Sequence, residues 1–191
     1  MIMRTILCEA LADDIGSVQL REVPLPEPGP GQVRVRLKAC AVNFPDLLII
    51  QGKYQFKPPL PFAPGGEAAG DIDACGAGVS WREGDAVIVG MRYGGFADYV
   101  VVDAAQVKAL PAGMSYAAGA SYQTAYLTAY VALHRRGDLQ PGETLLVHGA
   151  TGGVGMAAVD LGKYMGAQVI ATGGRDSKLA VVAARGADHV I

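Results

Sequence analysis

The chain has 191 residues, of which 51% are hydrophobic and 18% are charged, and its formal net charge is −2. This length and composition suffice for one sizeable core or two small domains. No block of lysine and arginine occurs, so the electrostatic footprint of a protein that binds nucleic acid or an anionic membrane is missing. No signal peptide or membrane-spanning run is visible, and the three cysteines form no C-x-x-C pair. We therefore expect reduced thiols and a cytoplasmic protein that has neither nucleic acid nor membrane as a partner.

Short strand patterns separated by glycine and proline turns fill the first part of the chain. The clearest is the alternation of apolar and basic residues from Val33 to Ala39, which predicts a strand with one buried and one solvated face. Further strands are expected at residues 3–8, 18–23 (as the hairpin partner of 3–8), 67–74, 85–89 and 96–102, with a short helix at 43–52. Many short strands with such turns favour a β barrel or sandwich for residues 1 to about 110.

The pattern changes at Ser115, where an alanine-rich helix is expected. Ser115 is suited to cap it, and Arg135 and Arg136, followed by Gly137, suit its end. The next segment predicts a strand at 145–147, a helix from Val154 to Met165 and a second strand at 169–171. Strand, glycine-rich loop, helix and strand in this order form the βαβ unit that binds dinucleotides.

The loop of this unit has the sequence GATGGVG. Gly152 has no Cβ, so backbone can approach a pyrophosphate, and Gly155 allows the helix to pack tightly on the first strand. The helix N-terminus offers unpaired N–H groups to the anion. The loop residues predicted to bind the cofactor are Ala150, Thr151, Gly152, Gly153, Val154 and Gly155. Ala150 stands where G-x-G-x-x-G has its first glycine, and the alternative is an ordinary βα turn with incidental glycines.

The end of the second strand bears on the choice of cofactor. An NAD site usually has an acidic residue here that binds the ribose hydroxyls, but no carboxylate stands at this strand tip. Arg175, Ser177 and Lys178 are predicted to hold the 2′-phosphate of NADPH, and Gly173 beside them is also predicted to bind the cofactor. We therefore favour NADPH over NADH. The same residues also suit the solvated start of a helix that is capped by Asp176 or Ser177.

A second crossover helix is expected at 177–185, and a third strand begins at residue 190. A doubly wound domain normally has about six strands, so this pattern contains only the first part of one. The first strand would keep an unpaired apolar edge. We expect the chain to be the N-terminal part of a longer enzyme or a truncated reading frame.

Several stretches carry a family resemblance: AVNFPDLLIIQGKY, PGGEAAG, WREGDAVIV, GGFADYVVV and LTAYVALHRRGDLQPGETLLVHGATGGVG. They resemble the zinc-free medium-chain dehydrogenases/reductases of the quinone oxidoreductase, zeta-crystallin-like, family. The resemblance covers the whole chain and implies an α/β fold. It places a GroES-like β-barrel catalytic domain at residues 1–114, the first part of a Rossmann NADPH-binding domain at 115–191, and a cleft between them. Asn43 and Gly66 stand where zinc-dependent relatives have cysteine and histidine ligands, so no metal is expected.

By this resemblance, Asn43 and Tyr54 line the substrate pocket, and Tyr54 orients the acceptor oxygen or donates a proton. Thr128 resembles the threonine that touches nicotinamide. The alternatives are a helix N-cap for Asn43, a loop aromatic for Tyr54 and a core helix threonine for Thr128.

The function that the resemblance implies is metal-free, NADPH-dependent reduction of a quinone or an α,β-unsaturated carbonyl (an enone), by a full-length form that is a homodimer. The alternative is a non-catalytic NADPH-binding protein or a truncated, inactive homologue.

Overall fold

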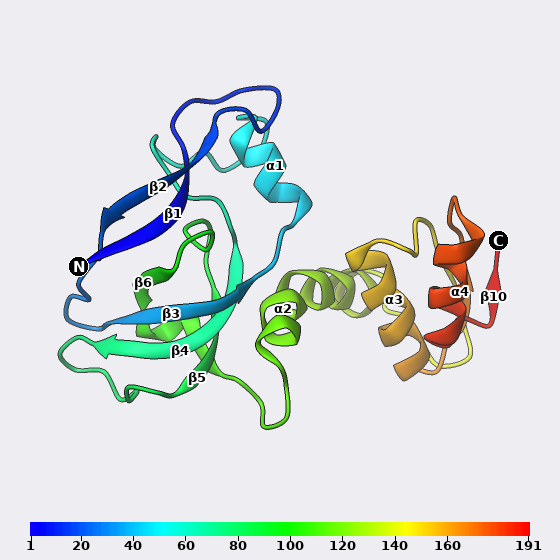
Figure 1. Ribbon diagram of the computed structural model, residues 1–191. Coiled ribbons are helices and arrows are strands. Elements are labelled where there is room, and N and C mark those ends of the chain that lie inside the picture. The colour runs from blue at the N-terminus through cyan, green and yellow to red at the C-terminus, as the bar shows by residue number, and fades with distance from the viewer. The chain divides into compact units, whose positions relative to one another are not determined.

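The computed structural model describes residues 1–191, and the chain divides into two compact units, residues 1–121 and 122–191 (Figure 1). The division falls inside helix α2 (Tyr116–Tyr130). The domain boundary expected between residues 114 and 115 lies just before the start of this helix and stays a prediction. None of the helices combines the length and apolar character that crossing a bilayer requires.

The first unit contains a hairpin and a five-stranded antiparallel sheet with the strand order β6-β3-β4-β5-β7. The hairpin pairs β1 (Ile2–Cys8) with β2 (Val18–Pro24), as expected. The sheet strands are β3 (Gln32–Cys40), β4 (Glu67–Cys75), β5 (Ala86–Gly90), β6 (Tyr99–Asp103) and β7 (Val107–Ala109). The short helix α1 (Phe44–Ile50) follows β3, and one 3₁₀ turn (Ala104–Gln106) precedes β7.

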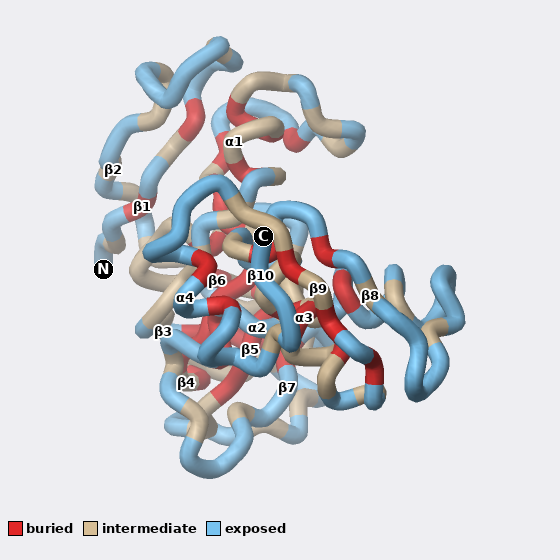
Figure 2. Tube along the Cα trace, turned by 90° about the vertical axis from the view of Figure 1, so that its right-hand side faces the viewer, coloured by how far each residue is buried: buried red, intermediate tan, exposed pale blue.

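Apolar side chains from all five strands form the core of this unit, and Figure 2 marks the buried residues of the chain in red. The buried members are Val33, Val35, Ile72, Val87, Val89, Val100, Val102 and Val107. Val33 and Val35 are buried, as the alternating pattern of β3 predicts. Arg34, expected on the solvent-facing side of the strand, is only 7% exposed. Its guanidinium is paired with Asp73 at 2.7 Å and Glu27 at 2.9 Å, and these partners make its burial tolerable.

Two strand assignments need correction. Residues 96–98, expected at the start of β6, bond instead to β1: the Ile6 N–H donates to the Phe96 carbonyl oxygen at 2.8 Å, and the Asp98 N–H donates to that of Arg4 at 2.9 Å. This segment therefore joins the hairpin to the sheet. Strand β7 is missing from the sequence prediction because its three residues give too short a pattern, and it forms only by pairing with β5.

The second unit is the start of a Rossmann-like parallel sheet with the strand order β10-β9-β8. After α2 come β8 (Thr144–Val147), α3 (Gly153–Tyr164), β9 (Gln168–Ala171), α4 (Asp176–Ala184) and β10 (His189–Val190). Strand β8 lies at the edge and pairs only with β9, and Leu146 on it is 50% exposed. The buried core residues are Val147, Ala150, Val159, Val169, Ala171 and Val182.

The long helix differs from its prediction at one end. Ser115 caps its start, because the Ser115 Oγ accepts the Ala118 N–H at 3.2 Å. At the other end the α-helix stops at Tyr130 and continues as a π-helix (Val131–Arg136). Gly137 follows but has a φ of −85°, and it is Asp138 that adopts the left-handed conformation, with a φ of 46°. The glycine therefore marks the helix end without supplying the left-handed cap.

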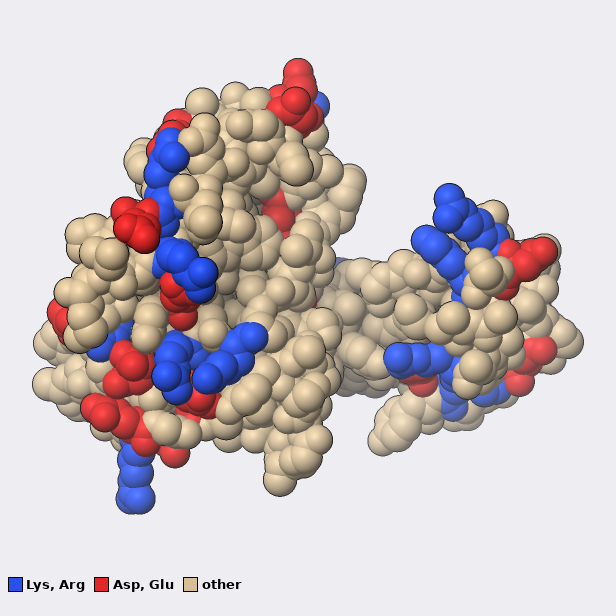
Figure 3. All heavy atoms as spheres, in the orientation of Figure 1, with Lys and Arg blue, Asp and Glu red and all other residues tan.

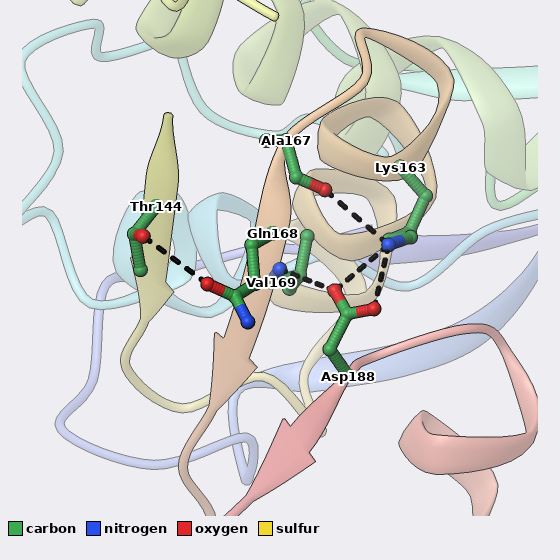
Figure 4. A network of polar contacts seen from close by, with 6 residues as sticks. All are labelled: Thr144, Lys163, Ala167, Gln168, Val169 and Asp188. Atoms are coloured by element: carbon green, nitrogen blue, oxygen red, sulfur yellow. Dashed lines mark hydrogen bonds and ion pairs between the residues drawn. The ribbon is translucent and has the colours of Figure 1, made fainter. Parts of the chain in front are cut away.

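An ion pair fastens α3 to the segment that leads into β10 (Figure 4). The Lys163 ammonium lies 2.7 Å from the Asp188 carboxylate and donates to the Ala167 carbonyl oxygen at 3.3 Å. Asp188 also accepts the Val169 N–H at 2.6 Å, at the start of β9. One carboxylate thus links a helix and two neighbouring strands.

We expect this carboxylate to make the second unit sensitive to acid. The hydrogen bond from Lys163, followed by that from the Val169 N–H, lowers the pKa of Asp188. Its stabilising contribution is present above the pKa of an unfolded aspartate, about 3.9, and is lost as the pH falls through the lower folded pKa. Urea unfolding of the wild type and Asp188→Asn at pH 7 and pH 3 measures this. The variant should lose less stability on acidification, and equal losses would contradict the assignment.

Candidate functional site

In the second unit the glycine loop and the end of β9 lie together. Strands β8 and β9 are parallel neighbours, so their carboxyl ends meet at one edge of the sheet. The Ala150 N–H donates to the Thr172 carbonyl oxygen at 3.0 Å. A Cβ added to Gly173 would lie 2.9 Å from the Thr151 side-chain methyl carbon. Ala150 and Thr151 thus lie beside Thr172 and Gly173, and these residues together form the rim of the sheet at the carboxyl ends of β8 and β9.

The N-terminus of α3 opens on this rim. Gly152 is the N-cap, with φ −86° and ψ 169°, and the helix begins at Gly153. The Met156 N–H donates to the Gly152 carbonyl oxygen at 2.8 Å, whereas the amides of Gly153, Val154 and Gly155 precede the first such bond and have no acceptor in the chain. Three free N–H groups and the positive end of the helix dipole suit an anion such as a diphosphate.

The glycines of the loop divide into two kinds. A Cβ on Gly155 would lie 2.5 Å from the Gly149 carbonyl oxygen and 2.7 Å from the Ala150 Cα, so this glycine is required for α3 to pack against the loop. A Cβ on Gly153 would meet nothing within 4 Å, and one on Gly152 would meet only the Gly149 oxygen, at 3.6 Å. Gly152 and Gly153 therefore leave an open cradle beside the free amides, which fits a dinucleotide diphosphate.

Basic side chains gather where β9 leads into α4 (Figure 3). Arg175, Ser177 and Lys178 are exposed, and neither cation makes an ion pair within the chain. The N-cap of α4 is Arg175 and carries no side-chain cap, so the expectation that Asp176 or Ser177 caps this helix is wrong. Both residues lie inside its first turn, and the 2′-phosphate role of Arg175, Ser177 and Lys178 stays a prediction.

In the first unit, Asn43 lies at the start of α1 between two buried carboxyl groups. Its N–H donates to Asp46 Oδ2 at 2.7 Å, and its Nδ2 donates to Glu67 Oε1 at 2.9 Å. Asp46 Oδ1 accepts the Gly65 N–H at 3.1 Å. Asn43 thus occupies the N-cap position, as the alternative reading had it, and forms a capping box with Asp46, while its Nδ2 bonds to Glu67.

Burial sets the electrostatics of this cluster. Asp46 is 4% and Glu67 1% exposed. Burial, assisted by the charge of Glu67, raises the pKa of Asp46. The same burial, followed by the charges of Asp46 and Glu67, raises the pKa of the Cys40 thiol to about 12. Cys40 donates to the Glu67 carbonyl oxygen at 3.1 Å and is therefore a protonated structural thiol, not a nucleophile.

Sequence reasoning missed Glu67 and Cys40 as parts of this cluster. The available signal was a single acidic residue at the start of an apolar strand, in PGGEAAG, because a carboxylate in such a run needs a partner. Across residues 1–191 no group of three or more histidine, cysteine or acidic side chains is arranged to hold a metal ion.

The two remaining predicted site residues have different surroundings. Tyr54 is half-buried against the cluster of Cys8, Ile49, Ile50 and Phe62, and its hydroxyl makes no hydrogen bond within the chain. Thr128 is exposed on α2, and its Oγ1 donates to the Thr124 carbonyl oxygen at 2.6 Å, so the reading as a core threonine is wrong. Their contacts with substrate and nicotinamide stay predictions.

Comparison with known proteins defines the class. Residues 29–112 match the model of the alcohol dehydrogenase GroES-like domain. The chain also superimposes on a probable oxidoreductase from Mycobacterium abscessus, with a TM-score of 0.93 and 37% identity, over 100% of this chain and 61% of that one. A GroES-like domain followed by the start of a Rossmann-like sheet is the architecture of one superfamily. The chain belongs to the medium-chain dehydrogenases/reductases.

Its relatives include quinone oxidoreductase-like proteins. Mouse quinone oxidoreductase-like protein 2 is 37% identical over 98% of this chain and 53% of its own length. The human synaptic vesicle membrane protein VAT-1 homolog is 48% identical over 75% of this chain and 37% of its own length. The chain thus spans about half the length, or less, of these relatives. The quinone oxidoreductase from Thermus thermophilus, whose structure was determined also in complex with NADPH, has a TM-score of 0.84 and 34% identity over 98% of this chain and 59% of that one.

Proposed function

We propose that this chain serves an NADPH-dependent reductase that transfers a hydride to a quinone or an α,β-unsaturated carbonyl without a metal ion. The observation that carries the proposal is the rim of the second unit, where free helix amides and an open glycine cradle adjoin unpaired cations and no carboxylate stands at the strand tip. The NADPH complex of the Thermus thermophilus relative supports the choice of cofactor. The quinone oxidoreductase names of the relatives support the acceptor.

Each group of residues has a role in this proposal. The amides of Gly153, Val154 and Gly155 hold the diphosphate, and Arg175 and Lys178 hold the 2′-phosphate. Bound NADPH supplies the hydride. In the first unit, Asn43 and Tyr54 orient the acceptor by hydrogen bonds. Asparagine and glycine at positions 43 and 66 are not zinc ligands, so polarisation of the acceptor falls to such hydrogen bonds.

Removal of the positive charges that follow β9 tests whether the chain prefers NADPH to NADH. We expect Arg175→Ala and Lys178→Ala each to weaken NADPH binding about 10-fold to 100-fold, since a hydrogen bond to a charged group contributes about 1.5–3 kcal/mol. NADH binding should not change. Fluorescence titration with both cofactors measures this, with Arg135→Ala, an exposed arginine on the π-helix, as the matched control. A wild type that prefers NADH would refute the assignment.

The VAT-1 homolog is named for a synaptic vesicle membrane and not for an enzymatic activity. Because a fold does not fix an activity, the second candidate is a protein that binds NADPH without turnover. Oxidation of NADPH in the presence of a small quinone or an enone distinguishes the two. Binding of NADPH without oxidation by either acceptor would support the second candidate.

A further inference from the structure

We propose that an apolar pocket in the first unit holds an alkyl tail of the acceptor, so that the substrate is a quinone or an enone that carries such a tail. The pocket has a volume of about 480 Å³ and lies between the β1–β2 hairpin and α1 (Figure 1). The inference rests on the function proposed above, because it assumes reduction of a quinone or an enone. It adds the class of acceptor and the residues that select it.

Side chains from three parts of the first unit line this pocket: the hairpin, α1 with the residues just before it, and the segment that leads into β6. They include Ile6, Leu20, Val42, Leu47, Ile50 and Phe96. The volume falls within the range of roughly 300–1,000 Å³ that is usual for small-molecule sites. One compact unit thus contains an almost wholly apolar pocket of the size of a ligand.

Hydrogen bonds fix the walls of the pocket relative to one another. The loop of the hairpin is bonded to the end of α1: Gln51 Nε2 donates to the Asp13 carbonyl oxygen at 2.6 Å, and the Lys53 ammonium lies 2.8 Å from the Asp13 carboxylate. At another wall, the Ile6 N–H donates to the Phe96 carbonyl oxygen at 2.8 Å. Because these bonds form within the protein, the pocket exists before a ligand binds, and binding loses little conformational freedom of the walls.

The pocket offers no uncommitted polar side chain to a carbonyl oxygen. Asp46 is the only polar residue among those that line it, and both of its carboxyl oxygens accept backbone N–H groups, those of Asn43 at 2.7 Å and of Gly65 at 3.1 Å. Burial of a carbonyl oxygen without a hydrogen-bond donor is unfavourable. The pocket therefore excludes the reducible end of the acceptor and accommodates hydrocarbon.

The pocket adjoins both residues that are proposed to orient the acceptor. Asp46, in its wall, bonds to the Asn43 N–H. Ile50, also in its wall, belongs to the buried cluster against which Tyr54 packs. All four residues belong to the first unit. An acceptor whose carbonyl group meets Asn43 and Tyr54 therefore has an apolar surface next to it for its tail.

Three of the lining side chains leave much of their surface in water. Val42 is 81%, Ile15 67% and Leu20 64% exposed. An alkyl tail that covers them removes apolar surface from water, which strengthens binding about threefold to fourfold for each methylene that becomes fully buried. The length of the tail should therefore control the affinity for the acceptor.

Methyl nuclear magnetic resonance tests the pocket without NADPH. The probe is a dimethoxy-methyl-benzoquinone that carries a decyl tail, and the comparison probe has a methyl group in place of the tail. All ring positions are substituted, so the free cysteines do not add to the ring. The decyl probe should shift the methyl signals of Ile6, Ile15 and Ile50 and leave that of Ile72, in the core of the sheet, unchanged. The methyl probe should bind at least about tenfold more weakly.

A charge introduced into the wall tests which residues bind the tail. Ile15→Asp should weaken binding of the decyl probe at least about tenfold, because the tail would bury an unpaired carboxylate. Ile2→Asp is the matched control, since Ile2 is equally exposed, at 67%, and does not line the pocket. It should leave the affinity unchanged. If Ile15→Asp fails to fold, Leu20→Asp takes its place with the same expected result.

Three results of the titration would each overturn the proposal. The first is an absence of shifts at Ile6, Ile15 and Ile50 with the decyl probe. The second is equal affinity for the two probes, which would mean that the ring and not the tail occupies the pocket. The third is a set of shifts that follow the protein concentration instead of the probe, which would assign the pocket to a second copy of the protein.

Steady-state kinetics test the role of the pocket in the proposed reaction. As the tail lengthens from methyl to decyl, the KM for the acceptor in NADPH oxidation should fall about tenfold or more. The kcat should stay nearly constant, because the tail is bound equally in the ground and transition states. Ile15→Asp should raise the KM for the decyl acceptor but not for the methyl one.

A KM that does not depend on the length of the tail would overturn the assignment of the pocket to the acceptor. If the wild type neither binds nor oxidises NADPH, the proposed function fails. The methyl shifts would in that case still decide whether the pocket takes an alkyl tail.

Discussion

Gly155→Ala is expected to destabilise the second unit by roughly 1–3 kcal/mol, which is the usual cost of forcing extra atoms into a packed site. The added Cβ would lie 2.5 Å from the Gly149 carbonyl oxygen and 2.7 Å from the Ala150 Cα. Both atoms belong to backbone, which cannot rotate away as a side chain can. Helix α3 must therefore shift outward and carry its three free amides with it, so NADPH binding should fall with stability. Urea unfolding and cofactor titration measure the two effects.

Gly153→Ala is the matched control two residues earlier on the same helix. A Cβ there meets nothing within 4 Å, and alanine favours helix over glycine by about 1 kcal/mol. The fold should be as stable as the wild type or slightly more stable. If the diphosphate lies in the cradle, this variant should nevertheless bind NADPH more weakly, because the methyl group occupies the cradle. Unchanged NADPH binding by Gly153→Ala would place the diphosphate elsewhere.

Asp46→Ala is expected to destabilise the first unit by about 2–5 kcal/mol, because it removes the acceptor of two backbone N–H groups, those of Asn43 and Gly65. Each is left without a partner in a place from which water is largely excluded, since Asp46 is 4% exposed. Relief of the repulsion between Asp46 and Glu67 offsets part of this loss. Thermal and urea unfolding measure the change.

Asp14→Ala provides the comparison for this experiment. Asp14 Oδ1 accepts the Gly16 N–H at 2.8 Å, which is the same kind of bond in an exposed turn. Water can replace the lost acceptor there, so we expect a change within about 0.5 kcal/mol. Equal effects of the two substitutions would mean that the cluster around Asn43 is not held by the Asp46 carboxyl group.

The sequence predicts the repeated local patterns well, because each depends on neighbours along the chain. The strand at β3, the βαβ order around GATGGVG and the cap at Ser115 are confirmed, and the alternation in β3 holds except at Arg34. Predictions fail where a partner distant in sequence decides the outcome. Arg34 is buried because Asp73 and Glu27 reach it, and β7 exists because β5 pairs with it. A period along the chain contains no information about such partners.

The candidate site divides in the same way. The glycine loop could be predicted because strand, turn and helix are contiguous in sequence. The loop lies beside Gly173 and the basic residues that follow β9 because β8 and β9 pair in parallel. The cluster of Cys40, Asn43, Asp46 and Glu67 could not be predicted, because its members come from two strands and a helix, and their pairing depends on burial.

By itself, then, the sequence indicates the class of the chain through its family motifs, and it predicts the glycine loop proposed to bind a dinucleotide, since spacing and glycine content fix the local backbone. Only the tertiary structure decides which polar groups become buried and which acceptors they find. The reason is physical: the free energy of a hydrogen bond or of a charge depends on its distance from partners and from water, and folding alone sets those distances.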